Sequence, residues 1–267
     1  EELEELLNTY DKVIIPRLNW GNNNLTSLPE NFGNLEVESN LILKYNKLTS
    51  LPESFGNLKV GGSLYLGNNK LTSLPESFGN LKVGSSLYLD YNKLTLLPES
   101  FGNLKIGGNL YLTYNQLTSL PESFSNLEVK GNLGLTRNQL ASLPESFGNL
   151  KVRGYLNLGH NQLASLPESF GNTKVGGTLW LYSNPWIIDA DFVNFCEKYK
   201  GELVLGDELE KVITTFLKRQ KKLEEWEESI VDEKLSIPKY LYHATYKPFL
   251  KSIKEKGLGN TRKKMWS

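Results

Sequence analysis

The sequence predicts an α/β repeat fold, a curved solenoid in which successive coils pair their strands into a parallel sheet. A 23-residue unit, reading LTSLPESFGNLKVGGSLYLGNNK from Leu48, returns through residues 18–186, and such a fixed period is typical of stacked repeats. Each copy contains a Leu-x-Leu tripeptide, such as Leu64-Tyr65-Leu66, with the period of two of a strand. A leucine, a phenylalanine and an asparagine also return at fixed places in the copies. Because one coil cannot bury its own apolar face, the copies must share an interior.

The solenoid needs a cover at its N-terminal end, where the first coil would otherwise expose that interior. Residues 1–17 begin EELEELLNTY, with leucines at helical spacing and acidic residues between them. We expect a short helical cap here. The first strand then falls on residues 18–20. After seven full repeats, an eighth strand on residues 179–181 closes the predicted sheet.

Two polar positions explain how the chain turns between strands. The asparagine after each strand, such as Asn69, can donate and accept hydrogen bonds where the backbone leaves the sheet inside the stack. We therefore expect a structural asparagine ladder. The segment from Ser73 to Glu76 has the spacing of a capping box, with serine at the cap and glutamate three residues later. It predicts a short helical or 3₁₀ turn on the convex side, with a solvated row of glutamates.

The repeat pattern stops after Pro185, and residues 187–235 predict a helical cap and linker. Asp189 has the position of an N-cap for a helix that carries Phe192 and Cys196, and a second helix is expected from Asp207. We interpret the single cysteine as a small buried apolar residue rather than a nucleophile.

The pattern L-x-L-x-x-N-x-L resembles that of leucine-rich repeat proteins over about two thirds of the chain. The repeats also resemble those of bacterial effector proteins that enter host cells, which suggests a bacterial or phage origin. Here LPESFGN stands in place of the double Leu-Pro of that group, and no ubiquitin-ligase cysteine domain follows. The resemblance therefore implies a repeat scaffold and not ligase activity.

Residues 236–267 have a different character, with a strand pattern followed by a helix that starts near Pro248. The stretch LYHATYKPFLKSIKEKGL resembles the opening strand and helix of ADP-ribosyltransferase-like domains and of RNA 2′-phosphotransferases. That resemblance implies that His243 would hydrogen-bond a ribose of NAD, with Thr245 nearby. One strand and one helix cannot build a closed NAD pocket, so we expect an incomplete domain and neither catalysis nor a cofactor in this chain.

The amino-acid composition of the chain limits the classes of partner and the cellular compartments that we expect for it. Thirty lysines and arginines balance thirty acidic residues, so no global field favours nucleic acid or a membrane surface. No apolar run approaches the length needed to cross a bilayer. One cysteine suits a reducing compartment, either the cytoplasm or the interior of a host cell. Two histidines and one cysteine cannot assemble a His/Cys metal cluster.

The side chains that point out of the predicted sheet form the candidate binding surface. One row contains Tyr65, Tyr88 and Tyr111, a second contains Tyr45, Tyr91 and Tyr114, and Trp180 and Tyr182 lie on the eighth coil. Tyrosine offers large contact area at low entropic cost and is enriched in binding hot spots. The alternative is a self-supporting aromatic ladder, and the two can coexist. We interpret His160 as an exposed loop residue.

The sequence therefore predicts a monomeric, non-catalytic module that binds a protein or peptide on a concave, tyrosine-rich face. The alternative hypothesis is the targeting half of an ADP-ribosyltransferase-like enzyme whose catalytic domain continues beyond Ser267. The two differ in whether NAD is a cofactor of the longer protein.

Overall fold

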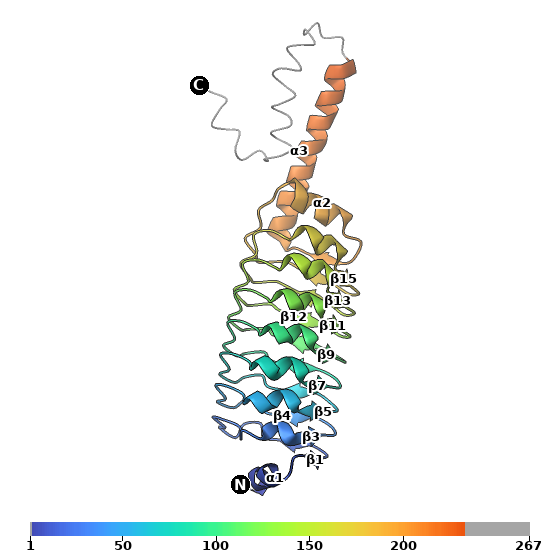
Figure 1. Cartoon of the computed structure of the whole chain (residues 1–267). Coiled ribbons are helices and arrows are strands. Elements are labelled where there is room, and N and C mark those ends of the chain that lie inside the picture. Colours follow the sequence, from blue (N-terminus) through green and yellow to red (C-terminus); the bar gives the residue numbers. More distant parts are fainter. Residues whose placement is uncertain (1, 233–267) are drawn as a thin grey trace. The chain divides into compact units, whose positions relative to one another are not determined.

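The computed structural model describes residues 2–232, and the chain divides into two compact units. Of the described residues, the first unit comprises 2–186 together with 200–204, and the second comprises 187–199 and 205–232. The segment predicted to resemble an ADP-ribosyltransferase opening, with His243 and Thr245, lies outside the described residues. Figure 1 shows the coils of the first unit stacked in sequence order, from α1 at the N-terminal end.

The Leu-x-Leu strands of the first unit form one parallel sheet of nine strands. Equivalent residues of neighbouring coils pair directly, as Leu64 does with Leu87. The strands are β2 (Leu18–Asn19), β4 (Leu41–Ile42), β6 (Leu64–Tyr65), β8 (Leu87–Tyr88), β10 (Leu110–Tyr111), β12 (Leu133–Gly134), β14 (Leu156–Asn157), β16 (Leu179–Trp180) and β17 (Leu203–Val204). The expectation that the eighth strand closes the sheet is wrong, because β17 pairs with β16 from outside the repeats.

A second parallel sheet, which the sequence did not lead us to expect, contains eight strands. Its strands are β1 (Val13–Ile15), β3 (Leu35–Val37), β5 (Lys59–Val60), β7 (Lys82–Val83), β9 (Lys105–Ile106), β11 (Glu128–Val129), β13 (Lys151–Val152) and β15 (Lys174–Val175). The aliphatic residue of strands such as β7 is buried, and the lysine before it is exposed. We call Lys59, Lys82, Lys105, Lys151 and Lys174 the lysine row.

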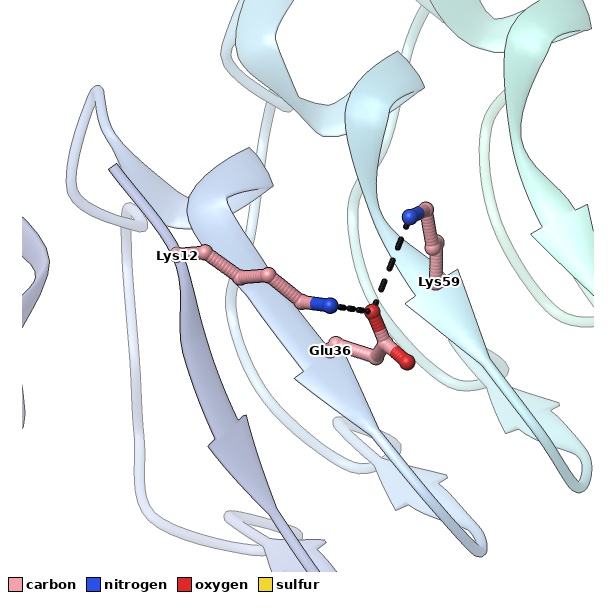
Figure 2. Close-up of polar contacts among 3 residues, drawn as sticks. All are labelled: Lys12, Glu36 and Lys59. Atoms are coloured by element: carbon pink, nitrogen blue, oxygen red, sulfur yellow. Dashed lines mark ion pairs between the residues drawn. The ribbon is translucent and has the colours of Figure 1, made fainter. Parts of the chain in front are cut away.

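At the N-terminal end of this sheet, Glu36 stands where most later coils carry a lysine. Figure 2 shows its carboxylate between two ammonium groups, with Oε2 2.8 Å from Lys12 Nζ and 3.6 Å from Lys59 Nζ. The hydrogen bond from Lys12 lowers the pKa of the Glu36 carboxyl. A glutamate is therefore accommodated at this position of the coil.

Each coil also contains a 3₁₀ helix between its two strands, which confirms the predicted short turn. These helices are η1 (Phe32–Asn34), η2 (Glu53–Asn57), η3 (Glu76–Asn80), η4 (Glu99–Asn103), η5 (Glu122–Asn126), η6 (Glu145–Asn149) and η7 (Glu168–Asn172). The predicted serine cap is wrong, because Pro75 holds the N-cap position of η3 without a side-chain hydrogen bond. A different serine, Ser77, donates from its hydroxyl to the Glu53 carbonyl of the preceding coil. Ser77 thus links neighbouring coils by a hydrogen bond and does not cap the 3₁₀ helix.

Beside the buried leucines, two columns of equivalent residues run through the interior from coil to coil. Neighbouring phenylalanine rings lie 5.6–6.5 Å apart with planes within 7° of parallel, in the column Phe32, Phe55, Phe78, Phe101, Phe124, Phe147 and Phe170. The asparagine ladder is also present. Asn92 accepts from the Leu71 amide at 3.0 Å and donates to the carbonyls of Leu66 and Leu89 at 3.1 Å each. Buried backbone groups in the turns are thereby satisfied.

The N-terminal helix α1 (Glu2–Thr9) meets the first coil. Leu7 is buried, and its carbonyl accepts from the Asn34 side chain at 3.4 Å. Asn31 also donates to the Asn8 side chain at 3.0 Å. These bonds hold α1 over the end of the shared interior, as the leucine spacing predicts.

The second unit contains α2 (Ala190–Lys198) and α3 (Asp207–Asp232). The predicted cap of α2 is confirmed, because the Asp189 carboxylate accepts from the Phe192 amide at 2.9 Å. Helix α3 begins at Asp207 as predicted, directly after Gly206, whose φ of 89° is readily adopted by glycine. None of the helices within residues 2–232 is long and apolar enough to cross a membrane.

Candidate functional site

The outward side of the nine-stranded sheet carries most of the aromatic residues singled out from the sequence. Leu64 and Leu66 are fully buried, whereas Tyr65 between them is only partly covered. The same alternation places Tyr88 and Tyr111 outward on β8 and β10. We call this outward surface, together with the turn that follows each of its strands, the tyrosine face.

The aromatic side chains of the first row contact one another in an unbroken series. The rings of Tyr65 and Tyr88 stack at 4.6 Å with planes 7° apart, and those of Tyr88 and Tyr111 lie 5.3 Å apart. The row then continues through Tyr155, whose hydroxyl lies 3.1 Å from that of Tyr111 and whose ring lies 4.7 Å from that of Trp180. Burial, and then the hydrogen bond with Tyr111, raise the pKa of the Tyr155 hydroxyl.

The sequence interpretation missed Tyr155 because it stands one position before its strand. The coils between Tyr111 and Trp180 carry the smaller Gly134 and Asn157 at the outward position. A Cβ on Gly134 would lie only 2.8 Å from Cδ1 of Tyr111, so glycine leaves the space into which that ring leans. The signal that could have revealed Tyr155 is this pair of small residues interrupting an aromatic row.

The second row lies in the turns, and its backbone is strained. Tyr45, Tyr91 and Tyr114 have φ angles of 57°, 53° and 54°, in the left-handed region. Two other coils carry Asn22 and Asn68 there, a residue type that adopts this region more readily, and the remaining coils carry an arginine, a histidine and a serine. The turn needs the conformation in every coil, but it does not need a tyrosine. Such strain is a feature of sites where a side chain has another task.

These strained tyrosines are also the most exposed of the predicted aromatic residues of the tyrosine face. Tyr45, Tyr91 and Tyr114 are 55%, 47% and 38% exposed. The rings of Tyr91 and Tyr114 stack at 4.3 Å, and the Arg137 guanidinium lies 5.0 Å from the centre of the Tyr114 ring. The Lys44 ammonium lies 5.5 Å and 5.7 Å from the rings of Tyr45 and Tyr65. Cations therefore contact both rows through ring faces.

The C-terminal end of the face holds the remaining predicted residues. Trp180 continues the first row as described, and Tyr182 meets His160 edge to face at 5.1 Å. His160 is half-buried against that ring and has a φ of 51°, so it is less exposed than predicted. The structure thus brings all eight predicted aromatic residues to one face, seven of them in the two rows and Tyr182 at the outward position between the rows.

Groups that could perform chemistry are sparse in the part of the chain that the structure describes. Burial raises the pKa of the Cys196 thiol to about 11, so at neutral pH it is a neutral thiol and a poor nucleophile. Within residues 2–232, no three His, Cys, Asp or Glu side chains are grouped so that they could hold a metal ion.

The repeating coil matches a known repeat type. A family model described as Leucine Rich Repeat matches residues 63–81, 85–104 and 109–127, which fall in three consecutive coils. These coils are leucine-rich repeats. The parallel strands, the asparagine ladder and the short 3₁₀ helices make the first unit a leucine-rich repeat solenoid.

Solved structures resemble this chain to different extents. The leucine-rich repeat domain of a Shigella effector is 29% identical with a TM-score of 0.52, over 76% of this chain and 84% of that domain. YopM from Yersinia enterocolitica is 28% identical with a TM-score of 0.45, over 64% of this chain and 34% of its own. A chain of the Drosophila Toll–Spatzle complex is 24% identical with a TM-score of 0.49, over 67% of this chain and 25% of its own. No curated protein matches the sequence.

Proposed function

We propose that this leucine-rich repeat chain is a protein-interaction module that holds an extended protein segment on its tyrosine face. The observation that carries the proposal is the second row. Three tyrosines occupy left-handed turn positions, at a cost of about 1 kcal/mol each relative to residues that prefer that region, and they remain exposed to solvent. Turn formation does not require them, whereas binding would use their area.

The dimensions of the face fit a chain rather than a small molecule. Nine strands at the usual spacing of about 4.8 Å give a strip roughly 38 Å long. The aromatic contact from Tyr65 to Trp180 pre-organises the rings, so little side-chain entropy remains to be lost on binding. Tyrosine and tryptophan are also the residues that most often dominate binding energy.

The test uses the 267-residue chain and a random 12-residue peptide display library as the probe. Selected peptides are measured by fluorescence anisotropy against wild type and against the triple variant Tyr65→Ala, Tyr88→Ala, Tyr111→Ala. The triple variant should lose at least tenfold in affinity, about 1.4 kcal/mol. Circular dichroism confirms that it remains folded.

The matched control lies in the same coils on the other sheet. The triple variant Lys59→Ala, Lys82→Ala, Lys105→Ala removes three outward side chains without touching the tyrosine face. It should bind the selected peptides as wild type does. Equal losses in the two triple variants, or none in the tyrosine variant, would contradict the proposed function.

A further inference from the structure

One acidic side chain lies within the tyrosine face. Tyr88 and Asp90 alternate outward around the buried Leu89, which places them about 7 Å apart along the chain. Tyr91 follows directly in the turn. Asp90 therefore stands between the stacked pair to which Tyr88 belongs and the stacked pair to which Tyr91 belongs.

The Asp90 carboxylate leans over the neighbouring coil, where a glycine leaves room for it. A Cβ on Gly67 would lie 2.9 Å from Oδ1 of Asp90 and 3.1 Å from Oδ2. Asp90 is half-buried in this position, and burial is the main reason that the pKa of its carboxyl is raised. The surroundings thus disfavour the charge that Asp90 carries at neutral pH.

No cation on the described part of the chain compensates that charge at close range. Among residues 2–232, no lysine, arginine or histidine nitrogen comes within ion-pair distance of Asp90. The Asp90 backbone amide and the charge of Lys44, two strands away, both lower the pKa of the carboxyl, but burial has the larger effect. The Lys44 ammonium contacts the rings of Tyr45 and Tyr65 instead. Arg137 contacts Tyr114.

The position is also unlike its equivalents in the other coils. The same outward place is occupied by Gly21, Lys44, Gly67, Thr113, Thr136, Gly159 and Tyr182. Neither the repeat pattern nor the strand geometry therefore calls for an acid at this coil. A carboxylate bordered by aromatic rings attracts a cation through both its charge and the ring faces.

We propose that Asp90 is the specificity residue of the tyrosine face and receives a lysine or arginine side chain of the bound segment. This inference rests on the proposed function, because it names the chemistry of the segment that the face holds. The incoming cation would pair with the carboxylate above Gly67, while the flanking residues of the segment lie along the two tyrosine rows.

The test extends the peptide selection on the 267-residue chain. Selected peptides should contain a lysine or arginine, and replacing it with the uncharged norleucine should weaken binding to wild type at least tenfold. Asp90→Asn should weaken the basic peptide to a similar extent and leave the norleucine peptide unchanged. If the two changes together weaken binding no more than either change alone, the peptide cation and Asp90 contact each other.

A second variant tests the space in front of the carboxylate without removing its charge. Gly67→Ala should displace the Asp90 side chain and weaken the basic peptide, whereas Gly21→Ala, at the same place in the first coil, should not. Binding should also weaken as pH falls and Asp90 is protonated, in wild type and not in Asp90→Asn. The other charged or titratable groups facing this site are Lys44, Tyr65, Tyr88, Tyr91, Tyr114 and Arg137.

The outcomes separate the two claims. Binding that depends on the tyrosines but is insensitive to Asp90→Asn would overturn this inference and leave the proposed function standing. Binding that is insensitive to the tyrosine triple variant, or the absence of any selected peptide, would overturn both.

Discussion

The two sheets of the solenoid are made by the same coils, yet their outward surfaces differ completely. Both consist mostly of two-residue strands in parallel register, with an aliphatic side chain buried in the shared interior. The nine-stranded sheet stacks tyrosines outward, as at Tyr65 and Tyr88. The eight-stranded sheet stacks lysines outward, as at Lys82 and Lys105.

Because the strands pair in register, equivalent side chains of neighbouring coils lie next to one another. This stabilises one outward surface and destabilises the other. Aromatic neighbours on adjacent strands attract one another, and like charges directly opposite repel. Lys59 pairs with Lys82, and Lys82 with Lys105. The same position also accepts an acidic residue, because Glu36 forms an ion pair with Lys12 and Glu128 forms one with Arg153. The fold tolerates both surfaces because its stability comes from the interior.

The largest expected effect comes from the interior that the two sheets share. Phe101→Ala removes a fully buried ring from the middle of the phenylalanine column and should lower the free energy of unfolding by about 3–5 kcal/mol. Urea unfolding measures the loss, and hydrogen exchange should show both sheets losing protection together.

The control for this variant is Leu96→Ala in the same coil, at a side chain that is 56% exposed. It should change stability by less than about 0.5 kcal/mol. If Phe101→Ala weakened the exchange protection of one sheet alone, the two sheets would not share one interior.

The two tyrosine rows should differ, by a smaller amount, in how much each contributes to the stability of the fold. Tyr88→Asn removes stacking from an ordinary strand residue and should cost about 1 kcal/mol. Tyr91→Asn also loses a stacked ring, but it relieves the left-handed strain at a φ of 53°. We therefore expect Tyr91→Asn to cost clearly less in thermal or urea unfolding. An equal or greater cost would mean that Tyr91 serves the fold rather than a partner.

The smallest expected effect concerns the lysine row. Lys82→Glu would place opposite charges beside Lys59 and Lys105 and should raise stability by about 0.5 kcal/mol at low salt. Because exposed charges are screened, the gain should shrink in 1 M salt. Lys82→Gln, which only removes the repulsion, should gain about half as much. A loss of stability in Lys82→Glu would show that the lysines are favoured by the sheet itself.

The repeating features could be predicted from the sequence because their physics is local and copied in each coil. The alternation at Leu64-Tyr65-Leu66, the column of Phe101 and its equivalents, and the ladder of Asn92 and its equivalents all follow from one 23-residue unit. The outward direction of Tyr65 follows from the same alternation, so the aromatic character of the candidate site was also visible in the sequence.

The tertiary structure alone decided the features that depend on neighbours rather than on the unit. Leu203–Val204 joins the sheet from outside the repeats, Pro75 and not the predicted Ser73 stands at the N-cap of its turn, and Ser77 bonds the preceding coil. Tyr155 enters the aromatic row only because Gly134 and Asn157 leave space. Asp90 is half-buried over Gly67, which has no side chain to exclude its carboxylate. A sequence period specifies what each coil contains, but the environment of a side chain is set by coils 23 or more residues away, which only the stacked structure brings together.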